Sequence, residues 1–450
     1  MVNVAIVVGT GYAGEDVLHK TPWAKYLNHN LYVASRIKTD VHFNEALKDL
    51  IGSHELKNLK NSIDELMEIS KEFSVIYDSE YLKKTYTDAQ IKDLEKWLGV
   101  PFHYISSMDR RFYDRNEMGD IRDEGELNNY LAGLLLFFKE FFKKNEINVF
   151  INTLEDDLFS LIAYFVAKKL KLEVIGFLAG RFPEEGIIFC KDFSEICDFR
   201  KLNSCDLKTI QSMYNLSTLV GRETLERNKN FLSLGSISLK HRKFKRALTY
   251  RKFRNHILGY YDCEKFIMEP FDINLNLLDL LFKNTKKILR TVLLRSILKK
   301  ADDNSYLLFP LHYMEDAQIT FREPLLDQFK LIRDISRTLP LDSYLYVKPH
   351  PHYMGSDVSF RELFKISKLE NVKVINPTYP PIELIINSKG VITLNSTTGF
   401  EALVMGVPVI TLGHDFYCRD DICYVVRENR DLSKKIMDLW RDDYKIDKKT

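Results

Sequence analysis

The sequence lacks the features that mark secreted, metal-binding and membrane-spanning chains. Its 450 residues contain six cysteines, with no Cys-x-x-Cys pair and no Cys/His ligand spacing among them. The longest apolar run, YLAGLLLFF, is too short to span a bilayer, and Met1 leads into VNVAIVV without a basic leader or a cleavage site. We therefore expect reduced thiols in a cytoplasmic protein that attaches to a membrane at most by its surface.

Excess charge and internal repetition are also absent. The 65 basic residues oppose 63 acidic ones, and this balance excludes a protein built as a whole to coat nucleic acid. No repeat of fixed period and no low-complexity tract is present. A length beyond one hydrophobic core, with 45% hydrophobic residues, predicts two globular domains.

Both ends of the chain alternate strand and helix patterns. Strands are predicted in the N-terminal half at residues 2–8, 31–35, 73–78, 147–152 and 173–178, with a helix at 156–172. After Asn304, strands are predicted at 306–310, 343–347, 372–375, 391–394 and 408–412, with helices at 322–339, 359–369, 381–388 and 399–406. This βα repetition predicts two doubly wound α/β domains with parallel sheets.

The middle of the chain is basic and helical. Residues 240–254 hold eight Lys or Arg and no acid, and 286–300 form a second basic stretch. We predict an N-terminal domain at 1–220, a basic helical connecting segment at 221–304, a C-terminal domain at 305–425 and a C-terminal helix at 426–450.

Two polar motifs follow strands of the predicted C-terminal domain, where parallel sheets bind their ligands. In the first, prolines restrict the backbone around Lys348 and His350, so both side chains leave the strand in a fixed direction that suits a phosphate. The second is a turn into a helix formed by Asn395, Ser396, Thr397, Thr398 and Gly399. Its hydroxyls and amides suit phosphate oxygens, Gly399 allows close approach of a ligand, and Glu401 is placed for ribose hydroxyls. The structural alternatives are a satisfied polar His and an ordinary N-cap.

Four segments, FPLHYMEDAQ, LPLDSYLYVKPHP, NVKVINP and VITLNSTTGFEALVMGVPVITLGHDFY, resemble the capsule polysaccharide biosynthesis family in their order and spacing. This family includes bacterial transferases of 3-deoxy-manno-octulosonic acid (Kdo). The resemblance spans about Leu307 to Tyr417. It implies a GT-B glycosyltransferase, in which two Rossmann-like domains face a cleft, the N-terminal one binding the acceptor and the C-terminal one the nucleotide-sugar donor. It also implies a CMP-activated keto sugar acid, such as Kdo, as the donor, and a surface polysaccharide or glycolipid as the acceptor.

The resemblance also assigns roles to single residues. His350 and the turn from Ser396 to Thr398 would bind the donor phosphate. His312 stands where many relatives have Gln, so donor contact and shaping of the cleft both stay open for it. Glu315 is placed either for a sugar or base contact or for a structural role. GFLAGRFPEEGIIFCKDF resembles an acceptor-domain segment, in which Arg181 would pair with a substrate anion or simply cap a helix at the surface.

A glycosyl transfer needs a carboxylate, either as nucleophile for retention or as base for inversion. NTLEDDLF supplies acids where a predicted strand ends, and among them we favour Asp156 and Glu155. Acids in a first helical turn are otherwise dipole partners, and the anomeric outcome stays open. We expect no cofactor and no metal, because Lys, His, hydroxyls and a helix dipole can stabilise the leaving phosphate.

Two alternatives concern the chemistry. Gly9, Gly11 and Gly14 follow a strand in the G-x-G-x-x-G pattern of dinucleotide-binding oxidoreductases, but acids follow at once and Pro22 interrupts the helix. We therefore prefer a glycine-rich acceptor loop that includes Gly11. A polyol-phosphate transferase of wall-polymer type would also use Lys-x-His-Pro, but chains of that type usually carry Asp-Tyr-Ser-Ser at the second motif.

A third alternative is a scaffold that binds membranes or nucleic acid through the basic stretches. Polybasic helices are attracted to anionic lipid, and the same attraction keeps an enzyme near a lipid-linked acceptor. We predict peripheral contact with an anionic membrane through 240–254 and 286–300, and no nucleic-acid partner.

Overall fold

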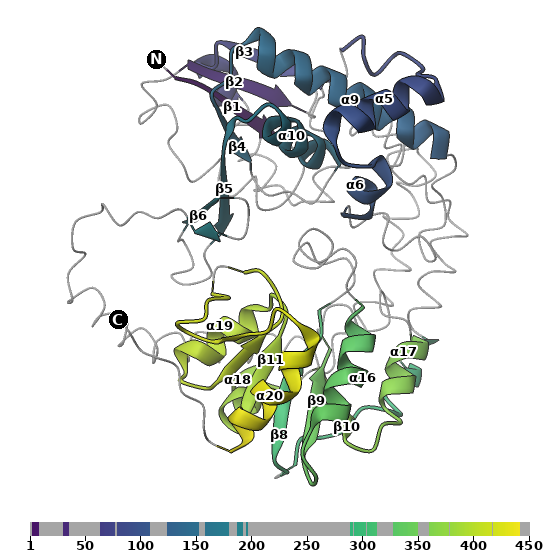
Figure 1. Cartoon of the computed structure of the whole chain (residues 1–450), viewed down its shortest axis with the longest axis vertical. Coiled ribbons are helices and arrows are strands. Elements are labelled where there is room, and N and C mark those ends of the chain that lie inside the picture. Colours follow the sequence, from purple (N-terminus) through teal and green to yellow (C-terminus); the bar gives the residue numbers. More distant parts are fainter. Residues whose placement is uncertain are drawn as a thin grey trace, which may run out of the picture. The chain divides into compact units, whose positions relative to one another are not determined.

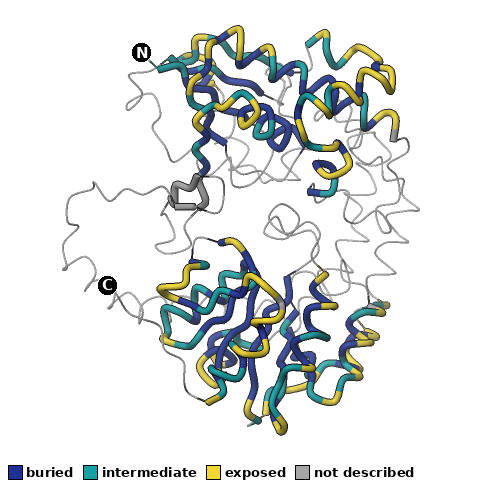
Figure 2. The backbone as a smooth tube through the Cα atoms, in the orientation of Figure 1, coloured by how far each residue is buried: buried dark blue, intermediate teal, exposed yellow. Residues whose placement is uncertain are grey.

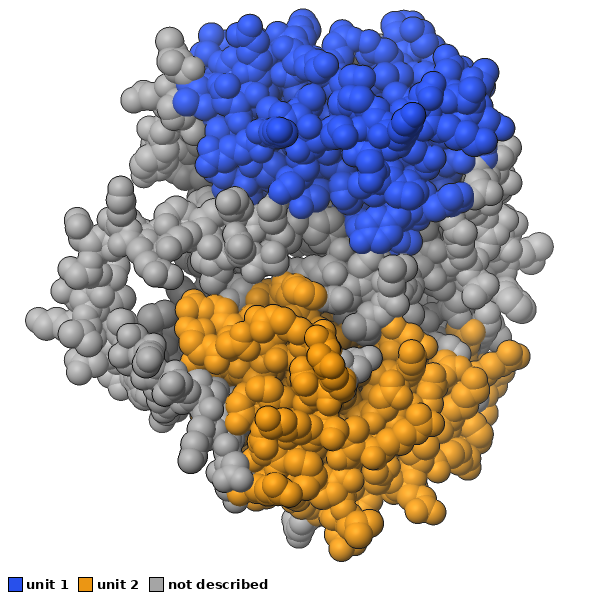
Figure 3. Space-filling model, in the orientation of Figure 1, with its two compact units in different colours: residues 1–197, 253–276 blue, residues 198–252, 277–450 orange. Residues whose placement is uncertain are grey.

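The computed structural model describes residues 2–8, 30–35, 64–76, 79–108, 124–152, 158–179, 187–191, 195–196, 289–290, 292–302, 304–312, 327–349, 360–377, 379–415 and 417–441. They belong to two compact units: the first contains the described residues up to Ile196, and the second contains those from Leu289 onward (Figure 3). Each unit has one sheet with helices packed on it (Figure 1).

The sheet of the first unit has the strand order β3-β2-β1-β4-β5-β6-β7. Its strands are β1 (Asn3–Val8), β2 (Asn30–Ser35), β3 (Glu72–Val75), β4 (Val149–Asn152), β5 (Glu173–Ala179), β6 (Ile187–Lys191) and β7 (Glu195–Ile196). The first five in chain order pair in parallel, and β6 and β7 extend the edge in antiparallel fashion. The direction of winding reverses between β1 and β4, which makes the sheet doubly wound as predicted.

Four helices of this unit are α5 (Asp88–Leu98), α6 (Phe102–Met108), α9 (Glu124–Lys144) and α10 (Leu158–Lys169). The apolar run noted in the sequence lies in α9, where Phe138 packs on Phe142 of the same helix and on Phe159 of α10. Its apolar length therefore serves the core of this unit. Within the part of the chain that the structure describes, no helix is both long and apolar enough to cross a bilayer.

The second sheet is parallel throughout, with the order β10-β9-β8-β11-β12-β13. Its strands are β8 (Tyr306–Pro310), β9 (Tyr344–Lys348), β10 (Val372–Val374), β11 (Gly390–Thr393), β12 (Val409–Thr411) and β13 (Tyr424–Val425). The strands predicted for this half are confirmed to within one residue at each end, and β13 is added to them. The winding reverses between β8 and β11, so the chain contains two doubly wound units, as the sequence predicted.

The helices of this unit are α16 (Gln328–Thr338), α17 (Phe360–Ile366), α18 (Pro381–Ile386), α19 (Thr397–Val404) and α20 (Asn429–Trp440). The buried strands form its centre (Figure 2). The core also includes Leu294 and Ile297, from the segment predicted to connect the domains, and Ile436 and Leu439 of the C-terminal helix. Residues 221–288 of the predicted connecting segment lie outside the described residues.

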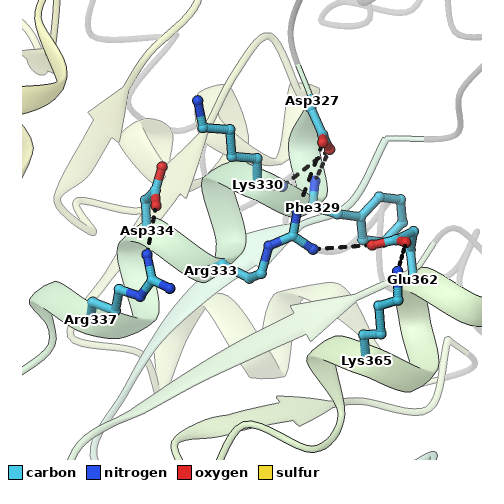
Figure 4. Close-up of polar contacts among 8 residues, drawn as sticks. All are labelled: Asp327, Phe329, Lys330, Arg333, Asp334, Arg337, Glu362 and Lys365. Atoms are coloured by element: carbon cyan, nitrogen blue, oxygen red, sulfur yellow. Dashed lines mark hydrogen bonds and ion pairs between the residues drawn. The ribbon is translucent and has the colours of Figure 1, made fainter.

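The start of α16 is fixed by its cap and by ion pairs (Figure 4). Asp327 accepts hydrogen bonds from the backbone N–H groups of Phe329 and Lys330, at 2.8 and 3.1 Å. Arg333 lies 3.0 Å from Glu362 of α17, and the lysine one turn further along α17 pairs with the same carboxylate. Exposed ion pairs contribute at most about 1 kcal/mol each. Together with the cap they orient the first turn of α16, which begins at a residue that contacts the candidate site.

Candidate functional site in the C-terminal sheet

The two polar motifs predicted from the sequence meet at one edge of the second sheet. β8 lies between β9 and β11, and the winding reverses beside it. Lys348 ends β9 opposite Pro310 of β8, and the turn from Asn395 follows β11 on the other side of β8. Neighbouring strands lie about 5 Å apart, so the two motifs flank the end of β8 at a separation of roughly 10 Å. This edge, at the switch point of a parallel sheet, is where ligands of such folds bind.

Lys348 is a partly buried cation that contacts the backbone of the loop after β10. Its Nζ donates a hydrogen bond to the carbonyl oxygen of Pro377 at 3.1 Å. Burial lowers the pKa of Lys348 to about 8, and the carboxylate of Glu401 on α19 acts in the opposite direction. The side chain at the end of β9 therefore feels a charge on the helix that follows β11. Burial destabilises the charged ammonium of Lys348, and a cation in such a position is a candidate partner for an anion.

The turn after β11 is built around the hydroxyl and the carbonyl of Ser396. Ser396 is the N-cap of α19, and its Oγ accepts a hydrogen bond from the N–H of Thr398 at 3.2 Å. The Ser396 N–H donates to Thr393 Oγ1 at 3.1 Å, and the hydroxyl of Tyr417 donates to the Ser396 carbonyl at 2.6 Å. Ser396 is thus an ordinary N-cap, and the hydrogen bond from Tyr417 fixes the backbone of Ser396.

Gly399 has a packing role, beside the close approach of a ligand that was predicted for it. A Cβ at this position would lie 2.7 Å from Thr393 Cγ2 and 2.8 Å from the hydroxyl oxygen of Tyr417. The missing side chain therefore makes room for protein atoms behind the turn, and the tyrosine reaches Ser396 because residue 399 is glycine.

Asn395 connects two loops of this edge. It is 1% exposed, and its Oδ1 accepts a hydrogen bond from the N–H of His414 at 2.7 Å. A Cβ on Gly413 would overlap that oxygen. Thr411 Oγ1 also donates to the carbonyl of Leu394 at 3.0 Å, so the loop after β12 is bonded to the turn after β11. Asn395 was predicted to bind the donor. Its side-chain carbonyl positions the loop after β12.

His312 lies just beyond β8, between the two motifs, and is buried. Its backbone N–H donates to Gln328 Oε1 at 3.0 Å, and its carbonyl accepts from Gln328 Nε2 at 3.2 Å. Gln328 is the first residue of α16 and is itself buried. The paired hydrogen bonds fix the backbone where β8 ends. Donor contact and shaping of the cleft both stay predictions for His312.

Removing the hydroxyl of Tyr417 tests the support of the Ser396 turn. Tyr417→Phe is expected to weaken CMP binding about threefold to tenfold, because a hydrogen bond of roughly 1 kcal/mol no longer fixes the Ser396 carbonyl. Tyr306→Phe is the matched control, since its buried hydroxyl donates to the Leu384 carbonyl at 2.8 Å at the start of β8. Titration calorimetry should show weaker CMP binding for the first variant only. Equal affinities in both variants would remove Tyr417 from the site.

Sequence reasoning missed three supports of this edge: Gln328, Gly413 and Tyr417. Tyr417 and Gly413 fall within the segment that carried the family resemblance, and a glycine directly after a strand is a usable signal. The other predicted site residues lie outside the described residues, namely His350, Glu315, Glu155, Asp156, Arg181 and Gly11.

Comparison with known proteins finds the same family that the motifs resembled. Residues 280–424, which contain β8 to β12 complete, match the family described as capsule polysaccharide biosynthesis protein. The capsule polysaccharide export protein KpsS of Escherichia coli is 30% identical over 156 residues, which is 33% of this chain and 38% of KpsS. Protein FixF of Sinorhizobium fredii is 29% identical over 128 residues, which is 28% of this chain and 30% of FixF.

Among solved structures, the β-Kdo 2,7 transferase KpsC of Thermosulfurimonas dismutans is similar to 35% of this chain and 49% of its own, at 23% identity and a TM-score of 0.24. The chain thus spans well under half the length of the curated relatives that it matches. The family match confirms the resemblance inferred from the motifs, over the part of the chain that carries the candidate site.

Proposed function

We propose that this chain is a glycosyltransferase that takes a keto sugar acid, such as Kdo, from a CMP-activated donor and moves it onto a surface polysaccharide or glycolipid. The observation that carries the proposal is the placement of Lys348 and the Ser396 turn on either side of β8 at the switch point. The match of residues 280–424 supports a role in capsule polysaccharide synthesis. The choice of Kdo rests on the motif resemblance.

The leaving group of such a reaction is the phosphate of CMP. Its charge grows as the glycosidic bond breaks, and fixed positive groups stabilise that charge. Lys348 would supply a full charge from β9, and the first turn of α19 would supply the positive end of its dipole. Glu401 favours the protonated form of Lys348, which is the form that binds phosphate. We propose that no divalent metal takes part.

The first unit would bind the acceptor and supply the carboxylate. Glu155 and Asp156 follow β4 in the sequence, and Arg181 follows β5, so both segments continue from the carboxyl edge of that sheet. Either acid would serve as nucleophile for retention or as base for inversion. Product anomericity, read by NMR, decides between these two outcomes.

A thermal-shift panel of CMP, UMP, UDP, GDP and NAD tests the proposal. CMP at about 100 times its Kd is expected to raise Tm by roughly 5 °C, with smaller shifts from the others and no effect of EDTA. A dominant NAD shift would instead support the oxidoreductase alternative, whose Gly9 to Gly14 loop lies outside the described residues. A shift that EDTA abolishes would overturn the metal-free mechanism. Release of CMP from CMP-Kdo, but not from CDP-glycerol, separates the sugar acid from the polyol-phosphate alternative.

We also propose peripheral contact with an anionic membrane through residues 289–300. Residues 289–290 and 292–294 are helical, and the exposed fractions of Leu289, Val292 and Leu293 are 59%, 54% and 43%. Leu294 and Ile297 pack into the core, so the same segment is anchored on its other side. The flanking cations are Arg290, Arg295, Lys299 and Lys300. Apolar side chains between cations suit the boundary of an anionic bilayer.

Replacing Leu289, Val292 and Leu293 together by Ser is expected to reduce co-sedimentation with phosphatidylglycerol vesicles at least about tenfold, because the buried apolar area is lost. Leu341→Ser removes an apolar side chain that is 95% exposed and does not belong to this segment, and it should leave sedimentation unchanged. Equal sedimentation of the triple variant and the wild type would remove these residues from the membrane contact.

A further inference from the structure

Asn152 occupies the switch point of the first sheet. It is the last residue of β4, which lies between β1 and β5. Its Cα pairs with Gly176 on one side, and the preceding Ile151 pairs with Ile6 on the other. The winding of the sheet reverses between β1 and β4, so Asn152 lies where a doubly wound sheet binds its ligand.

The side chain of Asn152 is buried, and its amide oxygen makes no hydrogen bond to a described residue. The residue is 2% exposed, and among the described residues its Oδ1 has no hydrogen-bond partner. Described residues near it in the sequence include the buried apolar Phe150, Leu158 and Phe159 and the buried polar Ser160. A buried acceptor left unsatisfied costs about 1–3 kcal/mol, so an apolar side chain would be more stable here. Contacts within the described core do not explain why residue 152 carries an amide. A hydrogen bond from a ligand would explain it.

The chemistry of the atom limits what it can bind. An amide oxygen accepts a hydrogen bond from O–H or N–H, and it repels the oxygens of phosphates and carboxylates. The contrast with Lys348 in the second sheet is direct, because that side chain selects an anion. A group that donates a hydrogen bond is therefore the expected partner at the first switch point, and sugar hydroxyls are groups of this kind. If the side chain of Asn152 rotates so that Oδ1 points toward the sheet edge, no hydrogen bond to a described residue is lost, because Oδ1 makes none.

We propose that Asn152 is an acceptor-contacting residue, whose Oδ1 accepts a hydrogen bond from a hydroxyl of the acceptor glycan. This inference rests on the proposed glycosyltransferase function, since that function defines the acceptor. It places acceptor recognition at the residue that directly precedes the acidic segment containing Glu155 and Asp156.

The test uses the full chain, CMP-Kdo as donor and a panel of alkyl glycosides as acceptors. The glycoside that most accelerates CMP release by the wild-type protein is taken as the probe. Asn152→Leu is expected to keep or raise Tm, to leave CMP affinity unchanged and to raise the KM for the probe at least about tenfold. Asn371→Leu is the matched control, because its amide has a partner, donating to the Ser336 carbonyl at 2.6 Å. This control should lower Tm and leave the KM for the probe unchanged.

Asn152→Leu with a raised Tm and an unchanged KM would show that the amide is only a packing defect, and the inference would be overturned. Asn152→Ala also removes the oxygen and is measured in the same way if the leucine variant does not fold. Wild-type protein that releases no CMP from CMP-Kdo and shows no CMP thermal shift would contradict the proposed function, and the inference with it. Wild-type turnover with an Asn152 variant of unchanged KM contradicts the inference alone.

Discussion

Lys348→Met is expected to lower the affinity of the chain for CMP by about 10- to 100-fold. A hydrogen bond between an ammonium and a phosphate contributes roughly 1.5–3 kcal/mol, and methionine keeps the apolar stem while it removes the charge. Titration calorimetry at pH 7 measures the change. Lys373→Met is the matched control, because Lys373 lies in β10 of the same sheet and pairs with Asp302 at 2.5 Å. Its loss should cost stability and leave CMP affinity unchanged.

The same substitution should not destabilise the fold at pH 7. The ordinary pKa of a lysine is 10.5, and burial lowers that of Lys348 to about 8. Between these values the unfolded chain binds more protons than the folded one, so the stability of the wild type rises with pH over this interval. Below pH 8 the folded state bears the full cost of the buried charge. Methionine removes that cost, so Tm at pH 7 should stay level or rise while CMP affinity falls.

The lowered pKa of Lys348 also sets the pH dependence of binding. Phosphate binds the protonated amine, so CMP affinity should fall as pH rises past about 8. From pH 7 to 9.5 we expect the Kd of the wild type to rise about tenfold, with no comparable change in Lys348→Met. The phosphate of CMP is fully ionised over this range and adds no titration of its own. A wild-type affinity that is flat across the range, or that falls in parallel in the variant, would contradict the role given to Lys348.

The C-terminal sheet could be predicted from the sequence because its strands are buried on both faces. All five residues of β8 are buried, and so are all four of β11, so each appears as a short apolar run. The first unit was harder to predict. α5 begins with a capping box between Thr87 and Gln90, a signal that the sequence contains and that no predicted helix included. The antiparallel β6 and β7 are short edge strands, and no periodicity marked them.

The candidate site was predictable where its residues are local to a motif. Lys348 ends β9 and Ser396 comes shortly after β11, so the strand pattern placed them on one edge. Gln328 and Tyr417 act across many residues, on His312 and on Ser396, and such contacts arise only from tertiary packing. An amide at the start of a helix looks like any surface residue in the sequence. The packing role of Gly399 was missed for the same reason, since its contacts come from the interior.

Gly413→Ala is expected to cost about 3 kcal/mol or more of unfolding free energy and to abolish tight CMP binding. Its Cβ would overlap Asn395 Oδ1 and come within 2.5 Å of the carbonyl oxygen of Leu394 and 2.6 Å of its carbon. The asparagine can move only by giving up its hydrogen bond to the His414 N–H, which costs about 1 kcal/mol. Urea unfolding and calorimetry measure the two effects.

Gly406→Ala separates this steric effect from the general cost of replacing a glycine. Gly406 has a φ of +75° and nothing within 4 Å of the Cβ position, so alanine there should cost only about 1 kcal/mol and leave CMP affinity unchanged. Adding Asn395→Ala to Gly413→Ala removes the overlap with the amide but leaves the one with the Leu394 backbone. Because that backbone leads directly into Ser396, the double variant should still bind CMP weakly. Full recovery of CMP affinity in the double variant would show that the asparagine alone transmits the effect, and that the end of β11 tolerates displacement.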